Sequence, residues 1–298
     1  MSSPLLQFQA VSYTYPTAIQ PAIDHLDLTL DAGAKTVILG HNGCGKSTLL
    51  LLADGLYRCS AGQIYWKGEP LQYHAQALNQ WRQRIGLGFQ DPEQQLVAAT
   101  VSEDISYGLC NLPLSSSEIA CRLQQTLNDF SLQDLADRPL HHLSLGQKRR
   151  VALAGVMALQ PELLLLDEPT AYLDRPQTVH LLQELDRIHA NGTTIVMATH
   201  DLDLAYAWAD WVVVLQAGRL VLADRAELVF RQVDLLKQLQ LGLPTLLECW
   251  YALPTRWRDR QSPPKTIDQF RSKWQNSHID EAMSQNPVIK PVKPKYRD

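Results

Sequence analysis

The chain has 298 residues, of which 45% are hydrophobic and 19% charged, an ordinary composition for one large or two modest globular domains. Its formal net charge of −4 argues against a general nucleic-acid binder, which would carry a basic excess. The longest purely apolar runs, such as Leu163–Leu166 and Trp211–Leu215, are strand-sized and fall well short of the roughly 20 residues that a membrane-spanning helix needs. We therefore expect no nucleic-acid partner, and any membrane role has to come through a partner protein.

The cysteines and the N-terminus bear on the compartment. The five cysteines form no CxxC pair, which suits a reducing cytosol better than a disulfide scaffold. The segment Met1–Ala10 lacks a charged start and a long apolar run, so no secretory signal is predicted.

The N-terminal part of the chain is predicted to be rich in strands. Alternating apolar and polar residues indicate antiparallel strands with one solvated face at its start. A short apolar strand then leads into a glycine-rich turn, and the turn leads into a helix. The predicted elements are strands over Leu5–Tyr15, Ile23–Leu30, Thr36–Leu39, Ile64–Trp66 and Ile85–Phe89, and a helix over Lys46–Gly55.

From Asp91 to about Leu143 the chain becomes helical, polar and interrupted, and we interpret residues 91–160 as a helical insertion between two sheet-forming halves. An α/β pattern then returns, in which Asp174 is a predicted N-cap with Gln177 three residues on. The predicted elements are helices over Ser115–Phe130 and Gly146–Gln160 and from Asp174 to Asn191, strands over Leu163–Asp167 and Thr193–Thr199, and a hairpin of Trp211–Leu215 and Arg219–Ala223.

The segment Gly40–Ser47 fits the phosphate-binding pattern GxxxxGK[ST] and lies directly between a predicted strand and a predicted helix, which is the context that the motif requires. Its glycines let backbone N–H groups close around a β-phosphate, and the helix N-terminus adds its positive end. Lys46 would reach the β- and γ-phosphates, and the Ser47 hydroxyl would ligate Mg²⁺, so ATP and Mg²⁺ are the expected cofactors. The expected nucleotide-binding residues of this segment are Gly40, His41, Asn42, Gly43, Cys44, Gly45, Lys46, Ser47 and Thr48.

Cys44 lies inside this loop, where backbone N–H groups, a helix N-terminus and the Lys46 charge are each expected to lower a thiol pKa. One hypothesis is a reactive thiol whose alkylation blocks the ATP site. The alternative is a small residue tolerated at a variable position of the motif.

A pair of carboxylates, Asp167 and Glu168, follows the apolar run Leu163–Leu166. The carboxyl end of a buried parallel strand is where ligands bind in such sheets. Asp167 suits Mg²⁺ held through water, and Glu168 is free to polarise a water aimed at a γ-phosphate. The alternative, two solvated charges at a strand end, is weakened by the phosphate loop.

A second helix start, Leu143–Gln147, has Ser144 as its expected N-cap. By itself this pattern indicates only the beginning of a helix. It is also a second helix N-terminus suited to anions, and two such ends in one chain suggest that one serves a partner's nucleotide.

Five features occur in order: Gly40–Ser47, Gln90 after a strand, Leu143–Gln147, Leu163–Glu168 and His200 after a strand. Over about residues 5–240 this set resembles the ATP-binding subunit of an ABC transporter. The resemblance implies an α/β fold with a P-loop ATPase core sheet, an antiparallel β subdomain and an inserted helical subdomain.

The resemblance also implies roles for single residues. Tyr15 would stack on adenine, although Tyr13 competes for that role and either ring can be an edge-strand aromatic. Gln90 would touch Mg²⁺ and sense a membrane partner, unless it is simply a loop residue. His200 would hold the γ-phosphate and act in catalysis with Glu168, Lys46 and Gln90, or else be structural.

Two further implied roles involve a second subunit. Ser144, with Gly146 and Gln147, would contact the γ-phosphate of the partner across a head-to-tail dimer. Asp174 would be the acid in the loop that communicates between the two sites, and it is equally credible as a pure N-cap.

A narrower resemblance rests on Phe89–Leu96, Thr100–Gly108 and Gln147–Gly155, which look like the energy-coupling-factor group, and most like its cobalt/nickel branch. Members of this group take up cobalt, nickel or vitamins. The resemblance implies a peripheral subunit at the cytoplasmic face of the cell membrane that dimerises and powers an importer. Its partners would be a second ATPase subunit, identical or related, and integral membrane subunits.

Two departures from the family pattern leave alternatives open. Leu145 replaces the first glycine of the usual LSGGQ, and Tyr172 stands where glycine is common. A Cβ at Leu145 narrows the allowed backbone, which puts in doubt how well this chain completes its partner's site. A catalytically impaired partner in a heterodimer, a soluble ABC ATPase without a transport role and a small-molecule P-loop kinase are the competing readings.

The domain prediction is an ABC-type ATPase domain over residues 1–240 and a C-terminal extension over 241–298, disordered in its last part beyond Ser284. The extension is more basic than the rest. Residues 251–298 hold ten Lys/Arg against five Asp/Glu, a local charge of +5, which leaves −9 on the first 250 residues.

Overall fold

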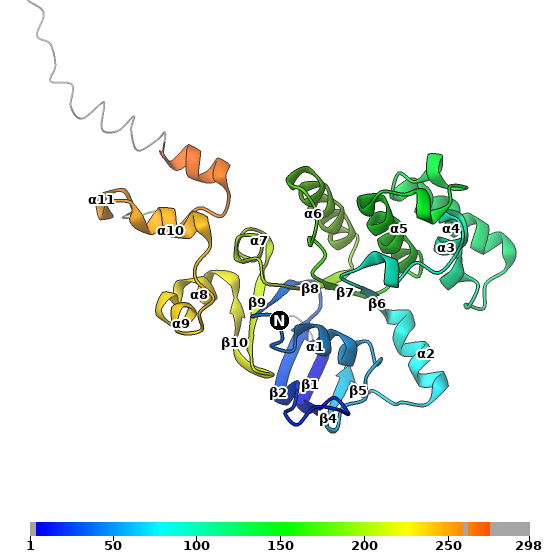
Figure 1. Ribbon diagram of the computed structural model, residues 1–298, viewed down its shortest axis with the longest axis horizontal. Coiled ribbons are helices and arrows are strands. Elements are labelled where there is room, and N and C mark those ends of the chain that lie inside the picture. The colour runs from blue at the N-terminus through cyan, green and yellow to red at the C-terminus, as the bar shows by residue number, and fades with distance from the viewer. Residues whose placement is uncertain (1–3, 259–261, 275–298) are drawn as a thin grey trace, which may run out of the picture. The chain divides into compact units, whose positions relative to one another are not determined.

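The computed structural model describes residues 4–258 and 262–274 (Figure 1), so the predicted disorder beyond Ser284 lies outside the described residues. The chain divides into two compact units, Met1–Leu241 and Gly242–Asp298. Within the described residues, no helix has both the length and the apolar character that crossing a membrane requires.

The first unit contains two β-sheets. The larger has the strand order β10-β9-β3-β8-β7-β6, in which neighbours from β9 to β6 run parallel and β10 runs antiparallel to β9. Its strands are β3 (Lys35–Leu39), β6 (Ile85–Gly88), β7 (Leu163–Asp167), β8 (Thr194–Thr199), β9 (Trp211–Gln216) and β10 (Arg219–Arg225). The smaller sheet is antiparallel, in the order β2-β1-β4-β5. Its strands are β1 (Pro4–Tyr13), β2 (Ile23–Asp31), β4 (Ala61–Trp66) and β5 (Glu69–Pro70).

The helices of the first unit are α1 (Lys46–Ala53), α2 (Ala75–Arg84), α3 (Val101–Leu109), α4 (Ser116–Asp129), α5 (Leu145–Ala158), α6 (Arg175–Ala190), α7 (Leu202–Trp208), α8 (Ala226–Arg231) and α9 (Val233–Gln238). The described helices α10 (Thr245–Ala252) and α11 (Thr255–Arg258) belong to the second unit. Short 3₁₀ turns lie at Pro92–Gln94, Gln133–Leu135 and Leu140–His142.

Burial explains why these segments form a parallel sheet. All six residues of β8 are buried, as are the four leucines of β7, and parallel strands covered on both faces are apolar along their whole length. One hydrophobic core joins α1 to both sheets, and Figure 1 shows α1 between them. This packing fixes the start of α1 beside the carboxyl ends of β3, β7 and β8.

Helices α3, α4 and α5 pack on one another within the predicted insertion. Reciprocal capping boxes fix the starts of α3 to α6: Thr100 with Glu103, Ser115 with Glu118, Ser144 with Gln147 and Asp174 with Gln177. Side-chain and backbone donors satisfy each other in such a box, which explains why the starts of α4, α5 and α6 were predicted within one residue. The start of α3 was not predicted. Helix α5 ends at Ala158, two residues earlier than predicted, and Gln160 has a left-handed φ of 56° before Pro161.

Helix α2 was not predicted, because Trp81 is its one buried residue and the sequence there lacks apolar periodicity. Trp81 packs into the hydrophobic core, and two side chains of α2 also donate hydrogen bonds at the end of α1. The Trp81 indole donates to Ala53 O at 2.9 Å, and Arg82 donates to Gly55 O at 3.0 Å. Helix α2 therefore supplies donors to carbonyls at the end of α1 that have no partner within that helix.

Asp54 caps the end of α1 and gives a test of stability against pH. Burial raises the pKa of this carboxyl from 3.8 to about 7, against the opposing effect of Arg82, whose Nε lies 3.7 Å from Asp54 Oδ2. Between these values the folded state keeps a proton that the unfolded state releases. Stability therefore falls as pH rises through this window, by at most about 1.4 kcal/mol per pH unit.

Asp54→Asn should remove this fall of stability with rising pH. We expect urea unfolding to show a variant more stable than the wild type at pH 8, with the difference shrinking toward pH 5. Asp129→Asn, a surface change, is the control and should leave the pH profile unchanged. Parallel profiles for the wild type and Asp54→Asn would contradict the prediction.

Candidate functional site

A cleft of about 440 Å³ opens at the carboxyl ends of the central parallel strands, beside the start of α1. Residues from distant parts of the sequence line it, as expected for ligand sites at this edge of a parallel sheet. The predicted site residues in its lining are Tyr15, Asn42, Gly43, Gly45, Lys46, Ser47, Thr48, Gln90, Glu168 and His200.

The phosphate loop is closed around the side chain of Lys46. This residue is 6% exposed, and its ammonium donates to Gly40 O at 2.7 Å and to His41 O at 3.3 Å. Gly45 has a φ of 109°, and a Cβ there would lie 2.5 Å from Ala22 O, so glycine is required at this position. The loop thus places a fixed cation and glycine backbone at the lining of the cleft.

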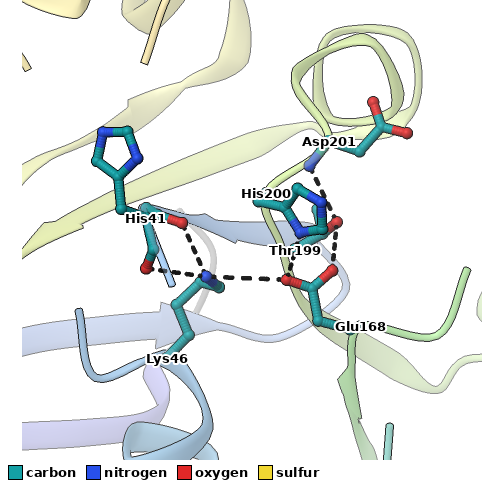
Figure 2. A network of polar contacts seen from close by, with 7 residues as sticks. His41, Lys46, Glu168, Thr199, His200 and Asp201 are labelled. Atoms are coloured by element: carbon teal, nitrogen blue, oxygen red, sulfur yellow. Dashed lines mark hydrogen bonds and ion pairs between the residues drawn. The ribbon is translucent and has the colours of Figure 1, made fainter. Parts of the chain in front are cut away.

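Glu168 lies at the centre of a polar network that Figure 2 shows. Its Oε1 accepts from His200 Nδ1 at 2.9 Å and lies 3.8 Å from Lys46 Nζ. Its Oε2 accepts from the Thr199 hydroxyl at 3.0 Å, which in turn accepts from the Asp201 N–H at 3.1 Å. Thr199 was not among the predicted site residues, although its place directly before His200 was a usable signal.

The backbone of Glu168 is left-handed, with a φ of 43°, a conformation that is strained for any residue with a Cβ. Glu168 N donates to Ala198 O at 2.8 Å, and Ala171 N donates to Glu168 O at 3.0 Å. Such strain at a cleft is typical of functional residues, where the surrounding structure holds it in place.

Asp167 directly precedes Glu168 and carries an unpaired atom. Its Oδ1 is buried and has no hydrogen-bond partner among the residues that the structure describes. Burial raises the pKa of Asp167, the hydrogen bond with Ser47 lowers it, and Glu168 raises it again. A buried carboxylate oxygen beside a serine hydroxyl fits a bound hard cation such as Mg²⁺.

Three tyrosines form one cluster at the side of the cleft. The ring of Tyr13 stacks on Tyr57 with centroids 5.0 Å apart, and Tyr15 meets both rings edge-on. The Tyr15 hydroxyl hydrogen bonds to Thr48 Oγ1 at 3.0 Å. Tyr15 lines the cleft, while Tyr13 is not among the lining residues and packs directly against the Tyr15 ring.

The expectation of a lowered Cys44 pKa is wrong. Cys44 is 6% exposed and belongs to the hydrophobic core. Burial raises the pKa of its thiol, and this effect outweighs the lowering by Lys46 and the backbone hydrogen bonds. The thiol is buried in the core, so the small-residue interpretation of this position is favoured.

The predicted signature residues lie at a second pocket, between α5 and α6. Ser144, Gly146 and Gln147 line it together with Leu173 and Gln177. Asp174 is the N-cap of α6, as one of its two predicted readings requires, and accepts from Gln177 N at 2.8 Å. The chain therefore carries its anion-suited helix start at a pocket separate from the cleft of Lys46.

The two departures from the family pattern differ structurally. Leu145 is the first residue of the right-handed helix α5, where a Cβ is fully compatible with the backbone. Tyr172 instead has a φ of 62° and is 80% exposed. The backbone of Tyr172 thus has a conformation that favours glycine. Its ring gains little stability from burial, because most of it is exposed.

Tyr172→Gly and Tyr172→Ala separate these two effects. Both variants remove the exposed ring, but only the glycine relieves the left-handed backbone. We expect the glycine variant to be more stable than the alanine variant by about 1 kcal/mol, measured as free energy of unfolding in urea. Equal stabilities would show that the turn at Tyr172 is unstrained.

Comparisons of sequence point to one family. Residues 23–171 match the model of the ABC transporter family. The energy-coupling factor transporter ATP-binding protein EcfA of Carboxydothermus hydrogenoformans is 43% identical over 82% of this chain and 88% of its own length. The cobalt import ATP-binding protein CbiO of Rhodobacter capsulatus is 46% identical over 76% of this chain and 83% of its own length.

Two solved structures share the fold. CbiO1 of Clostridium perfringens, part of the ABC transporter complex CbiONQ, has a TM-score of 0.72 at 35% identity, covering 84% of this chain and 99% of its own. An ATP-binding cassette solved as a dimer in a post-hydrolysis state with ADP and phosphate has a TM-score of 0.67 at 26% identity, covering 74% of this chain and 99% of its own. These structures confirm the predicted fold class.

Proposed function

The chain belongs to the ABC transporter family of ATP-binding subunits, in the energy-coupling-factor group, and we propose that it dimerises head to tail and hydrolyses ATP to power import of cobalt, nickel or a vitamin. As a member of this family it is an ATPase coupled to transport. In the proposed assembly it is a peripheral subunit at the cytoplasmic face of the cell membrane, bound to integral membrane subunits.

The observation that carries this proposal is the convergence of the site residues on one cleft. Lys46, Ser47, Gln90, Glu168 and His200 come from four places in the chain and surround the same space. A phosphate-binding loop, a carboxylate and a histidine in one cleft fit the hydrolysis of a nucleoside triphosphate. We assign adenine binding to Tyr15, at the side of this cleft.

Ser47, Asp167 and Gln90 are the residues that we propose to hold Mg²⁺. The unpaired Oδ1 of Asp167 and its contact with Ser47 support this assignment. When bound, Mg²⁺ would neutralise negative charge on the phosphates.

The network around Glu168 suggests how ATP binding prepares hydrolysis. Lys46 and His200, the two residues that we assign to the γ-phosphate, here contact Oε1 of Glu168. An arriving phosphate competes for both groups and frees that oxygen. The Thr199 hydroxyl still holds Oε2, so the freed carboxylate stays oriented to accept a proton from water.

The separate location of the signature supports the head-to-tail dimer. Ser144, Gly146 and Gln147 line the pocket between α5 and α6, so their proposed contact with a γ-phosphate requires the cleft of a second subunit. The dimeric structure of the related cassette supports such pairing.

The proposal is tested by co-purification and transport. Membrane proteins that co-purify with this chain in detergent would be reconstituted with it in vesicles. The vesicles would enclose Mg-ATP, and ⁵⁷Co²⁺ or ⁶³Ni²⁺ would be added to the outside solution. We expect one of these ions to accumulate inside the vesicles, and we expect Glu168→Gln to abolish this accumulation. Uptake of a vitamin alone, supplied in place of the ions, would select the vitamin among the proposed substrates. A chain that hydrolyses ATP without any membrane partner would favour the soluble alternative.

A further inference from the structure

Arg149 lies in helix α5, just after the signature, and its charge is buried. The residue is 8% exposed. Its guanidinium donates to the backbone carbonyl of Pro169 and to that of Gln90, the latter at 3.0 Å. These carbonyls belong to two different segments, the turn after β7 and the segment after β6, so Arg149 joins three parts of the chain.

Burying this cation is costly. Among residues 4–258 and 262–274, no carboxylate lies within ion-pair distance of Arg149, and its Nε has no hydrogen-bond partner. Desolvation lowers the pKa of the guanidinium, although Asp91 opposes this. An apolar side chain of similar volume would often cost less at such a position. The forked shape of arginine, which reaches two carbonyls at once, is what an apolar side chain lacks.

Both partners of Arg149 adjoin residues of the candidate site. Gln90 itself lines the cleft, and Pro169 directly follows Glu168, whose φ of 43° marks a strained turn. One guanidinium therefore bonds both to the Gln90 segment and to the turn that carries Glu168.

Other side chains join the Gln90 segment to α5 and serve as a comparison. Lys148 pairs with Glu93. Gln95 accepts from Phe89 N at 3.2 Å and donates to Ala152 O at 3.0 Å. These links hold the segment against α5, and of the three side chains Lys148, Arg149 and Gln95 it is Arg149 that also bonds to the Glu168–Pro169 turn in the described structure.

We propose that Arg149 is a positioning residue that couples the Gln90 segment to the Glu168 carboxylate. This inference rests on the proposed function and on the role in sensing a membrane partner that the family resemblance implies for Gln90. Movement of the Gln90 segment on contact with that partner shifts Arg149, and Arg149 shifts the Pro169 carbonyl and the orientation of Glu168.

The test compares Arg149→Met with Lys148→Met, which removes the neighbouring link to Glu93. ATP affinity, turnover of the isolated chain and the stimulation of turnover by the membrane subunits would be measured for each. We expect Arg149→Met to bind ATP within about threefold of the wild type, to lose about 10- to 100-fold in turnover, as for a displaced catalytic group, and to lose stimulation. Lys148→Met should keep both turnover and stimulation.

Arg149→Lys covers the case in which the methionine variant does not fold, because it keeps the charge but lacks the fork. It should remain folded and still lose most of the stimulation. Wild-type stimulation in Arg149→Lys, or an equal loss in Lys148→Met, would overturn the inference. Failure of the proposed function looks different, because the wild-type chain itself would then show no stimulated hydrolysis.

Discussion

Glu168→Gln should reduce ATP hydrolysis by about 10²- to 10⁴-fold, the range expected for loss of a positioned general base. The amide of the variant keeps the size of the carboxylate and can still accept from Thr199 or His200, but it cannot take a proton from water. ATP binding should be equal or tighter, because the variant removes the carboxylate that lies 3.8 Å from Lys46 Nζ in the wild type.

Single-turnover hydrolysis and nucleotide binding, measured on the same preparation, separate these two effects. Glu162→Gln is the matched control, since this residue lies just before β7 and pairs with Lys67 at the surface. It should retain wild-type turnover. If Glu168→Gln hydrolysed ATP at a near-normal rate, the assignment of Glu168 as the base would be wrong.

Much of the cleft could be predicted because its residues follow strand ends. Gln90, Glu168 and His200 come directly or nearly directly after β6, β7 and β8, and parallel neighbours bring their carboxyl ends to one edge. The strands themselves were predictable because their full burial requires continuous apolar runs. Local sequence patterns were therefore sufficient to predict site residues that the order of parallel strands alone brings together.

The features that sequence missed depend on contacts between distant segments. The local sequence around Cys44 predicts a lowered thiol pKa, but burial in the core reverses the direction. Helix α2 exists because Trp81 and Arg82 donate to the end of α1, which no periodicity in α2 reveals. The three-way link of Arg149 likewise becomes visible only when two strand ends and α5 are brought together.

The strain at Glu168 belongs to the same class. Glutamate carries no preference for a left-handed backbone, so its φ of 43° could not be foreseen from the residue type. The tertiary structure imposes it, through the hydrogen bond from Glu168 N to Ala198 O and the side-chain contacts with Thr199 and His200. The strained geometry of the site therefore lowers the stability of the folded chain.

Asp167→Asn should separate function from stability at this site. Loss of the carboxylate should lower the apparent affinity for Mg²⁺ in ATP binding by about 10- to 100-fold, as expected for a ligand that acts through metal-bound water. Turnover should fall with it. Nucleotide binding titrated with Mg²⁺, and in parallel with EDTA present, measures this loss. Asp129→Asn, at the surface, is the control and should titrate like the wild type.

The nucleotide-free variant should at the same time be more stable than the wild type. Because burial and Glu168 raise the pKa of Asp167 in the folded state, the folded chain holds a proton that the unfolded chain gives up, and stability falls as pH rises above the usual range of a carboxyl. Asparagine has no charge to bury, so its advantage should grow as the pH rises above 3.8, the ordinary pKa of this carboxyl, in urea unfolding without Mg²⁺. A variant that lost stability at pH 8 yet kept its Mg²⁺ dependence would mean that Asp167 serves the fold and not the metal.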